Sequence, residues 1–255
     1  MWYVKRRRPP KAIFDLDAWE KRAKKATNEV QRARTKVARK QALKKHKKVY
    51  QDLKPYLAWL FGDRCAFCEC SIVRNPGDVE HYRPKSEIEE NPKHPGYYWL
   101  AFKPENLLLS CEDCNRQFKK TRFPLESGSY ATSPGHSLDR EQPLLLHPCI
   151  DENIEDHIHI EVDQQSKAFG LVLAKSARGE RSIEIYGLNE GRLPGYRSEA
   201  MVNFLARVGM EFSQQRSLRP MTDKLTNGQQ DFSTACRLAF LIWREEQRRL
   251  LDVQV

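Results

Sequence analysis

The first sixty residues carry apolar side chains at a regular spacing within a very polar segment. These recur at alternating steps of four and three residues, as Trp19, Ala23, Ala26, Val30, Ala33 and Val37. The spacing predicts one long helix that begins near Asp17. Most residues of this stripe are small, so we expect it to pack against the protein's own helices, with a partner helix or a dimer as the alternative. Leu53, Leu57 and Leu60 are expected to bring the helix end down onto the core.

In the second half of the chain, the spacing of apolar residues is first that of strands and then that of helices. Polar and apolar residues alternate over 154–162 and an apolar run follows at 169–173, which predicts a β-hairpin. Beyond residue 182 the pattern is mainly helical and is strongest at 200–212 and 235–251. Two segments rich in turn-forming residues are predicted to be surface loops: 127–142 and 217–228.

These patterns divide the chain into three parts. We expect a basic arm with the long helix over 1–61, a compact core over 62–126, and a hairpin followed by helices over 127–255. The predicted fold class is α+β, mainly helical, with a small β-hairpin in the C-terminal half. The longest apolar runs are about six residues, far short of the roughly 18 of a membrane span. With no apolar stretch behind the basic residues at 5–8, a signal peptide is not expected, and the expected location is the cytoplasm.

The net charge of +10 is concentrated at one end of the chain. Residues 1–54 hold 19 Lys and Arg against 5 Asp and Glu, whereas the remaining 201 residues hold 25 against 29. A polyanion such as nucleic acid would therefore be attracted first to this arm. The alternative is a solvated basic helix without a ligand, and charge alone favours neither.

Cysteine spacing points to a metal. Seven cysteines, an odd number in a chain without a secretion signal, argue against a disulfide framework. Two C-x-x-C pairs lie 42 residues apart: Cys65 with Cys68, and Cys111 with Cys114. Four thiolates complete a closed tetrahedral site, so a structural Zn²⁺ that ties the ends of this loop is expected, with a coincidental or redox-active pair as the alternative. Cys70 could compete as a ligand, whereas Cys149 and Cys236 are expected to be ordinary thiols.

The loop between the cysteine pairs contains Glu80 and His81, followed by Pro84. A lone Glu-His pair is more often structural than catalytic. Its position between the two cysteine pairs is what favours a catalytic role here. Adjacent side chains on a regular strand face opposite sides. Glu80 and His81 can therefore converge only if the strand ends there, which Pro84 makes credible. Farther along, Asn106 precedes the second cysteine pair and Asn115 follows it directly.

This ordered set resembles the HNH endonuclease family, the ββα-metal nucleases. The resemblance implies that residues 62–126 form a zinc-stapled ββα-metal (HNH) nuclease core. The family pattern is an acidic-His pair at a strand end, an Asn in the next segment, and C-x-x-C-[H/N]-x-x-x-K opening a helix. More specifically, the chain is similar to the HNH nucleases of the Septu phage-defence type, the PtuB-like proteins. That similarity spans nearly the whole chain and includes the segments 79–85, 96–102, 143–148 and 185–189. His147 stands where an Asn is expected in that family.

The resemblance implies a role for each residue of the set. His81 is the expected general base, because a neutral imidazole with a pKa of about 6.5 can take a proton from water. Glu80 and Asn115 are expected to hold a catalytic Mg²⁺ or Mn²⁺, which prefers oxygen ligands. Asn106 is expected to orient His81 or the loop that carries it. On an α-helix Asn115 would be rotated about 100° from Cys114 and could therefore point to a different site.

Basic and aromatic residues surround this set. Five are candidate phosphate contacts, with plain surface charge as the alternative for each: Arg83, Lys85, Lys119, Lys120 and Arg122. The aromatic residues Tyr97, Tyr98, Trp99 and Phe102 are expected to be core, with base stacking as the alternative.

The expected function is metal-dependent hydrolysis of phosphodiester bonds in nucleic acid, with DNA favoured over RNA. The family resemblance implies the nuclease effector of an anti-phage defence system, gated by a partner ATPase. The alternatives are a zinc-dependent nucleic-acid-binding or structural subunit without cleavage activity, and an RNA (tRNA) nuclease. The sequence leaves open the cut site, the trigger, and whether the chain forms a homo-oligomer.

Overall fold

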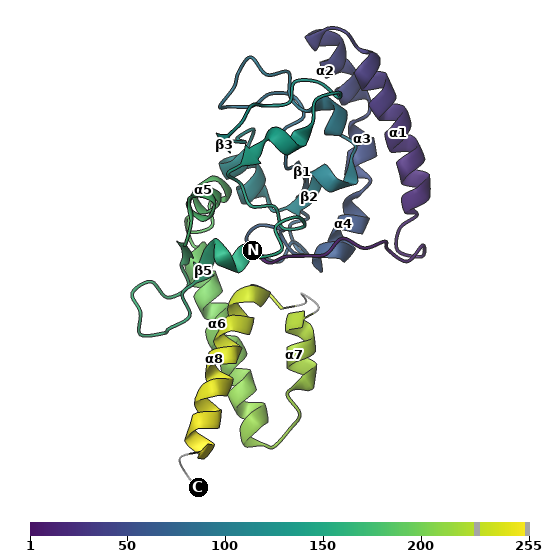
Figure 1. The fold of residues 1–255 in the computed structure, drawn as a ribbon. Coiled ribbons are helices and arrows are strands. Elements are labelled where there is room, and N and C mark those ends of the chain that lie inside the picture. Colours follow the sequence, from purple (N-terminus) through teal and green to yellow (C-terminus); the bar gives the residue numbers. More distant parts are fainter. Residues whose placement is uncertain (227–229, 253–255) are drawn as a thin grey trace.

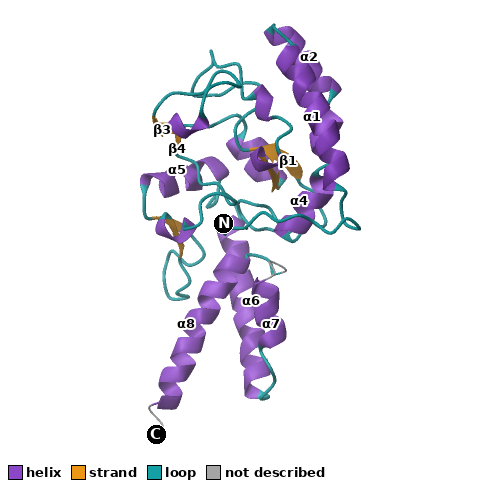
Figure 2. Ribbon diagram, turned by 45° about the vertical axis from the view of Figure 1, so that its right-hand side comes forward, coloured by secondary structure: helices purple, strands orange, loops and turns teal. Residues whose placement is uncertain are grey.

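The computed structural model describes residues 1–226 and 230–252. Helices α1 to α4 lie along one side of a body whose centre holds short two-stranded sheets and long loops (Figure 1). A lobe of three helices, α6 to α8, extends from one end of this body (Figures 1 and 2). No helix of the described residues is long and apolar enough to cross a membrane.

The predicted single N-terminal helix is wrong, because the chain forms four shorter helices. They are α1 (Leu16–Arg32), α2 (Lys36–Lys45), α3 (Lys47–Gln51) and α4 (Lys54–Phe61). Ala33 is extended, and the side chain of Thr35 caps α2 by accepting from the Ala38 amide. Through this break α2 turns back and packs against α1.

The apolar stripe is divided by the same break. Its first four residues, Trp19, Ala23, Ala26 and Val30, are buried on α1. Val37 lies beyond the break and is 68% exposed. The first part of the stripe therefore packs within the chain, as predicted. Leu53, Leu57 and Leu60 are buried, which confirms that this end of the helical segment reaches the core.

Two antiparallel strands form the centre of the body: β1 (Asp78–His81) and β2 (Leu107–Ser110). β2 is buried along its whole length and packs against α4. A π-helical turn, Asp113–Lys119, follows β2 directly. The aromatic residues around the short 3₁₀ helix Tyr98–Leu100 are buried, which confirms that they belong to the core: Tyr97, Tyr98, Trp99 and Phe102.

Two further sheets and one helix complete the body. β3 (Leu125–Ser127) pairs with β4 (Gln142–Pro143) at the base of the predicted loop. β5 (Ile158–Ile160) and β6 (Val172–Ala174) form the predicted C-terminal hairpin, and α5 (Ala177–Tyr186) follows. Three more short 3₁₀ helices are Pro104–Asn106, Leu138–Arg140 and Ile154–Asp156.

The lobe consists of α6 (Leu193–Ser213), α7 (Arg219–Thr226) and α8 (Ser233–Asp252). α6 and α8 contain the predicted helical segments. The loop predicted over 217–228 is wrong for 219–226, which form α7, whereas 227–228 lie outside the described residues. Met221 and Leu225, four residues apart, place apolar surface on one face of α7, and Leu225 is buried. This short stripe was hidden among polar neighbours in the sequence.

Candidate functional site

The four predicted cysteines meet in one cluster. The sulfurs of Cys65, Cys68, Cys111 and Cys114 all lie within 4.8 Å of one another. A tetrahedral ion with Zn–S bonds of about 2.3 Å holds its sulfurs about 3.8 Å apart. The Cys68 and Cys111 sulfurs are 3.8 Å apart, and the Cys114 amide points at the Cys111 sulfur from 3.5 Å. The donor set therefore fits a metal ion such as zinc.

Cys70 lies close enough to interact with this cluster. Its sulfur is 3.2 Å from that of Cys68, and it is only partly buried. The Cys70 carbonyl accepts from the Cys65 amide, which closes the turn that carries the first cysteine pair. Cys236 is buried and Cys149 partly buried, and neither is part of the sulfur cluster.

One short π-helical turn connects the sulfur cluster with the Glu80 region. Cys114 lies at its start and Lys119 at its end, and the Lys120 amide donates to the Asn115 carbonyl five residues earlier. The expectation of an α-helix here is therefore wrong. In this wider turn, residues four apart lie on one face, so Asn115 and Lys119 both point at β1.

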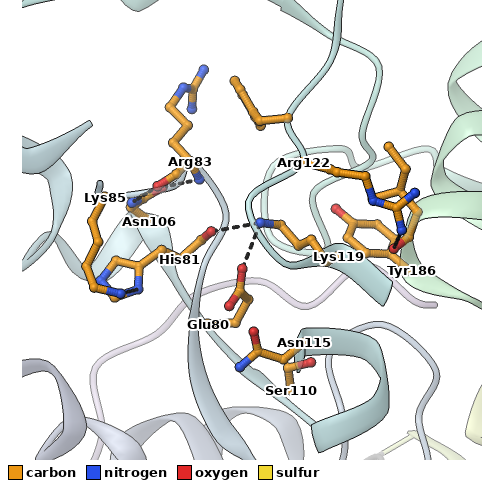
Figure 3. A network of polar contacts seen from close by, with 12 residues as sticks. Glu80, His81, Arg83, Lys85, Asn106, Ser110, Asn115, Lys119, Arg122 and Tyr186 are labelled. Carbon is orange, nitrogen blue, oxygen red and sulfur yellow. Dashed lines mark hydrogen bonds and ion pairs between the residues drawn. The ribbon is translucent and has the colours of Figure 1, made fainter. Parts of the chain in front are cut away.

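The face of β1 that meets this turn carries Asp78 and Glu80. Their side chains share one face, because positions two apart on a strand point the same way. Asn115 Nδ2 donates to Asp78 Oδ2 at 3.2 Å, and Arg116 also pairs with Asp78 at 2.7 Å. Lys119 Nζ donates to Glu80 Oε1 at 2.7 Å and to the His81 carbonyl at 3.0 Å. Figure 3 shows the Asn115 amide beneath the Glu80 carboxylate, with Lys119 above.

His81 lies on the opposite face of β1 from Glu80. Its ring is buried and meets the edge of the Tyr50 ring at a centroid distance of 4.8 Å. Nε2 lies 3.1 Å from the Ala101 carbonyl, which can only accept, so Nε2 carries the proton. Nδ1 is therefore the basic nitrogen, and it faces Lys85 Nζ at 3.4 Å. Burial, aided by Lys85, lowers the pKa of His81 well below 6.5, so the ring is neutral.

The structure thus brings the predicted residues to one strand end but separates two of them. Glu80 and His81 are the last residues of β1, as predicted, yet their side chains do not converge. Tyr50 and the Ala101 carbonyl, which fix the His81 ring, were missed by sequence reasoning. Neither has a local signal in the sequence, since α3 and the 3₁₀ turn meet β1 through the tertiary fold alone.

Asn106 fastens the loop that follows His81. Its Oδ1 accepts from the Arg83 amide at 2.8 Å, and its Nδ2 donates to the Arg83 carbonyl at 3.0 Å. Nδ2 also lies 3.3 Å from the Leu100 carbonyl. Asn106 is buried and acts on the loop rather than on the His81 ring itself.

The five basic residues proposed as phosphate contacts differ in their surroundings. Lys119 has no exposed surface, and its ammonium is occupied by Glu80. Arg83 pairs through Nε with the fully buried carboxylate of Glu141 at 2.8 Å, another residue that sequence reasoning missed. Arg122 donates to the Phe118 carbonyl and so closes the π-helical turn.

Two of these basic residues remain suited to contact a ligand. Lys85 is partly buried beside His81, and burial lowers its pKa. Lys120 is exposed at the end of the π-helical turn. Phosphate binding by all five residues stays a prediction.

Side-chain oxygens of Glu80 and Asn115, beside β1, are the candidate ligands for a second metal ion. Within the described ranges, the four cysteines are the one group of three or more His, Cys, Asp or Glu side chains close enough to share an ion. Beside β1, Glu80 Oε2 and Asn115 Oδ1 have no hydrogen-bond partner among the described residues. Oxygens of this type fit Mg²⁺, which usually takes one or two protein ligands and completes its shell with water and substrate phosphate.

The fold and these two clusters define an α+β protein with a four-thiol metal-type cluster next to a buried Glu-Lys-His arrangement. The chain is 38% identical to the Septu protein PtuB of Bacillus mycoides (strain KBAB4) over 157 residues, which cover 58% of this chain and 50% of that protein. It is 29% identical to the Septu protein PtuA of the same strain over 158 residues, which cover 60% of this chain and 21% of that protein.

The chain is thus homologous to Septu proteins, and it spans about half the length of the first relative and about a fifth of the second. The aligned part covers less of the chain than the nearly complete similarity expected from the sequence. No family model matches the chain, and no solved structure matches it.

Proposed function

We propose that this chain is a metal-dependent endonuclease of the HNH type that hydrolyses phosphodiester bonds of nucleic acid, with DNA favoured over RNA. The homology to the Septu proteins PtuB and PtuA supports a role in phage defence. The residue types at the end of β1 support hydrolysis as the chemistry, and in this proposal Glu80 and His81 act from opposite faces of the strand. The base, metal-binding oxygens and supporting amide come from the residues that the HNH resemblance names.

The observation that carries this proposal is the state of the His81 ring compared with two other buried histidines. His94 and His147 each donate through Nε2 to a backbone carbonyl and accept a backbone amide at Nδ1. Both nitrogens of these rings are therefore used by the fold. His81 donates through Nε2 to the Ala101 carbonyl in the same way, but its Nδ1 faces the side-chain ammonium of Lys85 rather than a backbone amide. In this proposal the Nδ1 lone pair becomes free for a proton when Lys85 pairs with a phosphate of the substrate instead.

Glu80 and Asn115 would hold the divalent cation through the two oxygens that lack hydrogen-bond partners in the described part of the chain. When bound, the cation would supply Lewis-acid stabilisation of charge on the phosphate and the leaving oxygen. His81 would take the proton of the attacking water at Nδ1. Asn106 would keep the loop that begins after His81 in place through its two bonds to Arg83.

The four cysteines would hold a structural zinc in this proposal. Their closed set leaves no open position for substrate, so the ion would act on folding rather than on catalysis. It would fix the start of the π-helical turn and, through it, Asn115.

A partner protein is also proposed, because homology reaches two different Septu proteins. The family resemblance suggests that this partner is an ATPase that gates the nuclease. Co-expression with an ATPase encoded beside the gene for this chain, followed by size-exclusion chromatography, would test this. A chain that elutes alone in that experiment would contradict it.

The central experiment compares cleavage by the wild type with that by His81→Ala. Supercoiled plasmid, single-stranded DNA and RNA are each incubated with Mg²⁺ or Mn²⁺, with and without the partner protein. We expect His81→Ala to lose at least about 100-fold in rate, because general-base catalysis contributes about 10²–10⁴-fold. His94→Ala is the matched control, since it removes a buried ring with the same carbonyl bond but no free nitrogen.

Each outcome separates the alternatives. Equal activity of the wild type and His81→Ala would reject His81 as the base. Cleavage of RNA alone would replace the DNA nuclease with an RNA nuclease. Binding without cleavage under every condition would favour the zinc-dependent binding or structural subunit.

A further inference from the structure

Lys119 places a buried positive charge where the proposed catalytic cation would lie. Its side chain has no exposed surface, and its ammonium is 2.7 Å from Glu80 Oε1. A second donated bond, to the His81 carbonyl, fixes the ammonium at the end of β1 (Figure 3). This ion pair was not expected from the sequence.

The charges around Glu80 sum to a positive value before any metal arrives. Lys119 contacts this carboxylate directly, and Lys85 lies near enough to interact with its charge: burial lowers the pKa of Lys85, whereas the attraction of Glu80 raises it. Asp78 is the other nearby carboxylate, and its charge is matched by Arg116. The His81 ring is neutral. Lys119 therefore neutralises Glu80, and Lys85 adds a further positive charge beside His81, in a poorly solvated site where charges interact more strongly than in water.

We propose that Lys119 makes binding of the divalent cation depend on a phosphate being present. This inference rests on the proposed function and names a regulation of the same site. Without nucleic acid, the Lys119 ammonium repels a divalent ion from Glu80 and occupies one of its two oxygens. With nucleic acid, a phosphodiester near Lys85 adds negative charge that offsets the ammonium groups and supplies further oxygen ligands, so the cation can bind the unpartnered oxygen of Glu80 beside Lys119.

The donor count supports the same dependence. Only two protein oxygens, on Glu80 and Asn115, are unpartnered in this region of the described chain. Mg²⁺ and Mn²⁺ bind such sites well only when substrate phosphate adds further ligands. Because coupling between two ligands is reciprocal, the cation also strengthens binding of the nucleic acid by the same factor. A chain without substrate therefore stays unloaded in the presence of abundant Mg²⁺.

The test measures Mn²⁺ affinity by electron paramagnetic resonance on zinc-loaded full-length protein. Binding is compared without nucleic acid, with a short phosphorothioate DNA duplex, and with a phosphorothioate RNA of the same sequence. The variants are Lys119→Met, which keeps the length of the buried chain without its charge, and Lys93→Met. Lys93 is exposed on a loop outside the site, so its variant controls for net charge.

We expect the wild type to bind Mn²⁺ at least about tenfold more tightly when one of the two nucleic acids is present, within the usual range of coupling. Lys119→Met should bind Mn²⁺ about tenfold more tightly than the wild type without nucleic acid, and its coupling should fall. Lys93→Met should match the wild type. Equal Mn²⁺ affinity of the wild type with and without both nucleic acids would overturn the inference, as would unchanged or weaker binding by Lys119→Met.

Two controls keep this result separate from the proposed function. If Lys119→Met loses its zinc or its cooperative unfolding, Lys119→Gln, which also removes the charge but keeps a hydrogen-bond donor for Glu80, takes its place in the same comparison. Cleavage that depends on His81 but comes without coupling would leave the nuclease standing and remove the role of Lys119. If nucleic acid strengthens Mn²⁺ binding but no condition gives cleavage, the role of Lys119 stands and the proposed nuclease activity is contradicted.

Discussion

Asn106 holds both polar groups of the Arg83 backbone with one side-chain amide, accepting from its N–H and donating to its carbonyl. Arg83 is the second residue after His81, so this pairing sets where the chain goes as β1 ends. The interaction is local in space but joins positions 23 residues apart. Its consequences for stability and for activity can be separated.

Asn106→Ala should lower the free energy of unfolding by about 1–3 kcal/mol, because it leaves buried backbone groups without partners. Asn189→Ala is a close control, because Asn189 makes the same pair of hydrogen bonds to a backbone away from the site. Its Oδ1 accepts from the Val172 amide at 2.8 Å, and its Nδ2 donates to the Val172 carbonyl at 2.7 Å. Urea unfolding should show similar losses for the two variants. Cleavage should fall strongly for Asn106→Ala alone, and an equal fall in both would assign Asn106 a purely structural role.

Elemental analysis should find about one zinc per chain, held by a four-thiolate site. Cys114→Ser should lose most of this zinc, whereas Cys149→Ser should keep it, because Cys149 is not part of the sulfur cluster. Cys70→Ser should also keep its zinc if Cys70 is a neighbour rather than a ligand, despite the 3.2 Å contact to Cys68. Less than about half an equivalent in the wild type would contradict the zinc site.

Stability should decrease in acid through the buried histidines. Burial lowers the pKa of His147 from 6.5 to about 3. Below pH 6.5 the unfolded chain therefore binds a proton that the folded chain does not, so stability falls as the pH falls toward 3. The loss is at most about 1.4 kcal/mol per pH unit for one such group.

His147→Asn should therefore lose less stability than the wild type between pH 7 and pH 5, by up to about 2 kcal/mol. Urea unfolding at the two pH values measures this difference. The exposed His136 supplies the control, and His136→Asn should behave as the wild type does. An unchanged pH dependence in His147→Asn would show that the ring is not held neutral in the folded protein.

Glu141→Ala should lower the free energy of unfolding by about 3–5 kcal/mol, because it leaves a partly buried guanidinium without its partner. The carboxylate of Glu141 accepts from Arg83, from the Tyr97 hydroxyl and from the Ala131 amide. The control is Glu112→Ala, which breaks an exposed pair with Arg116 and should cost at most about 1 kcal/mol. Similar losses in the two variants, measured by urea unfolding, would contradict a buried role for Glu141.

Features with a fixed local spacing could be predicted from the sequence. Each C-x-x-C turn places its own two thiols close together, and the four thiolates that a tetrahedral ion needs predict that the two pairs meet. The strand that ends at His81, the hairpin of β5 and β6, and the buried aromatic residues at 97–102 follow from period and composition.

Features that depend on contacts between distant elements could not be predicted. The break between α1 and α2 depends on an ordinary Ala33 and the Thr35 cap, within a stripe whose spacing continues unchanged. The burial of Lys119 depends on a π-helical turn facing β1, and a Lys in a basic sequence gives no sign of it. The sequence likewise gave no indication that Tyr50 covers the His81 ring.

The length of the π-helical turn of residues 113–119 sets the spacing between the sulfur cluster and the carboxylates of β1. Cys114 faces the sulfurs, and Asn115 and Lys119 meet Asp78 and Glu80. Substitutions at its outward positions leave these distances unchanged, but a single inserted or deleted residue would turn one end away from its target. We therefore expect homologues of this chain to differ in the outward-facing residues of this turn but to conserve its length.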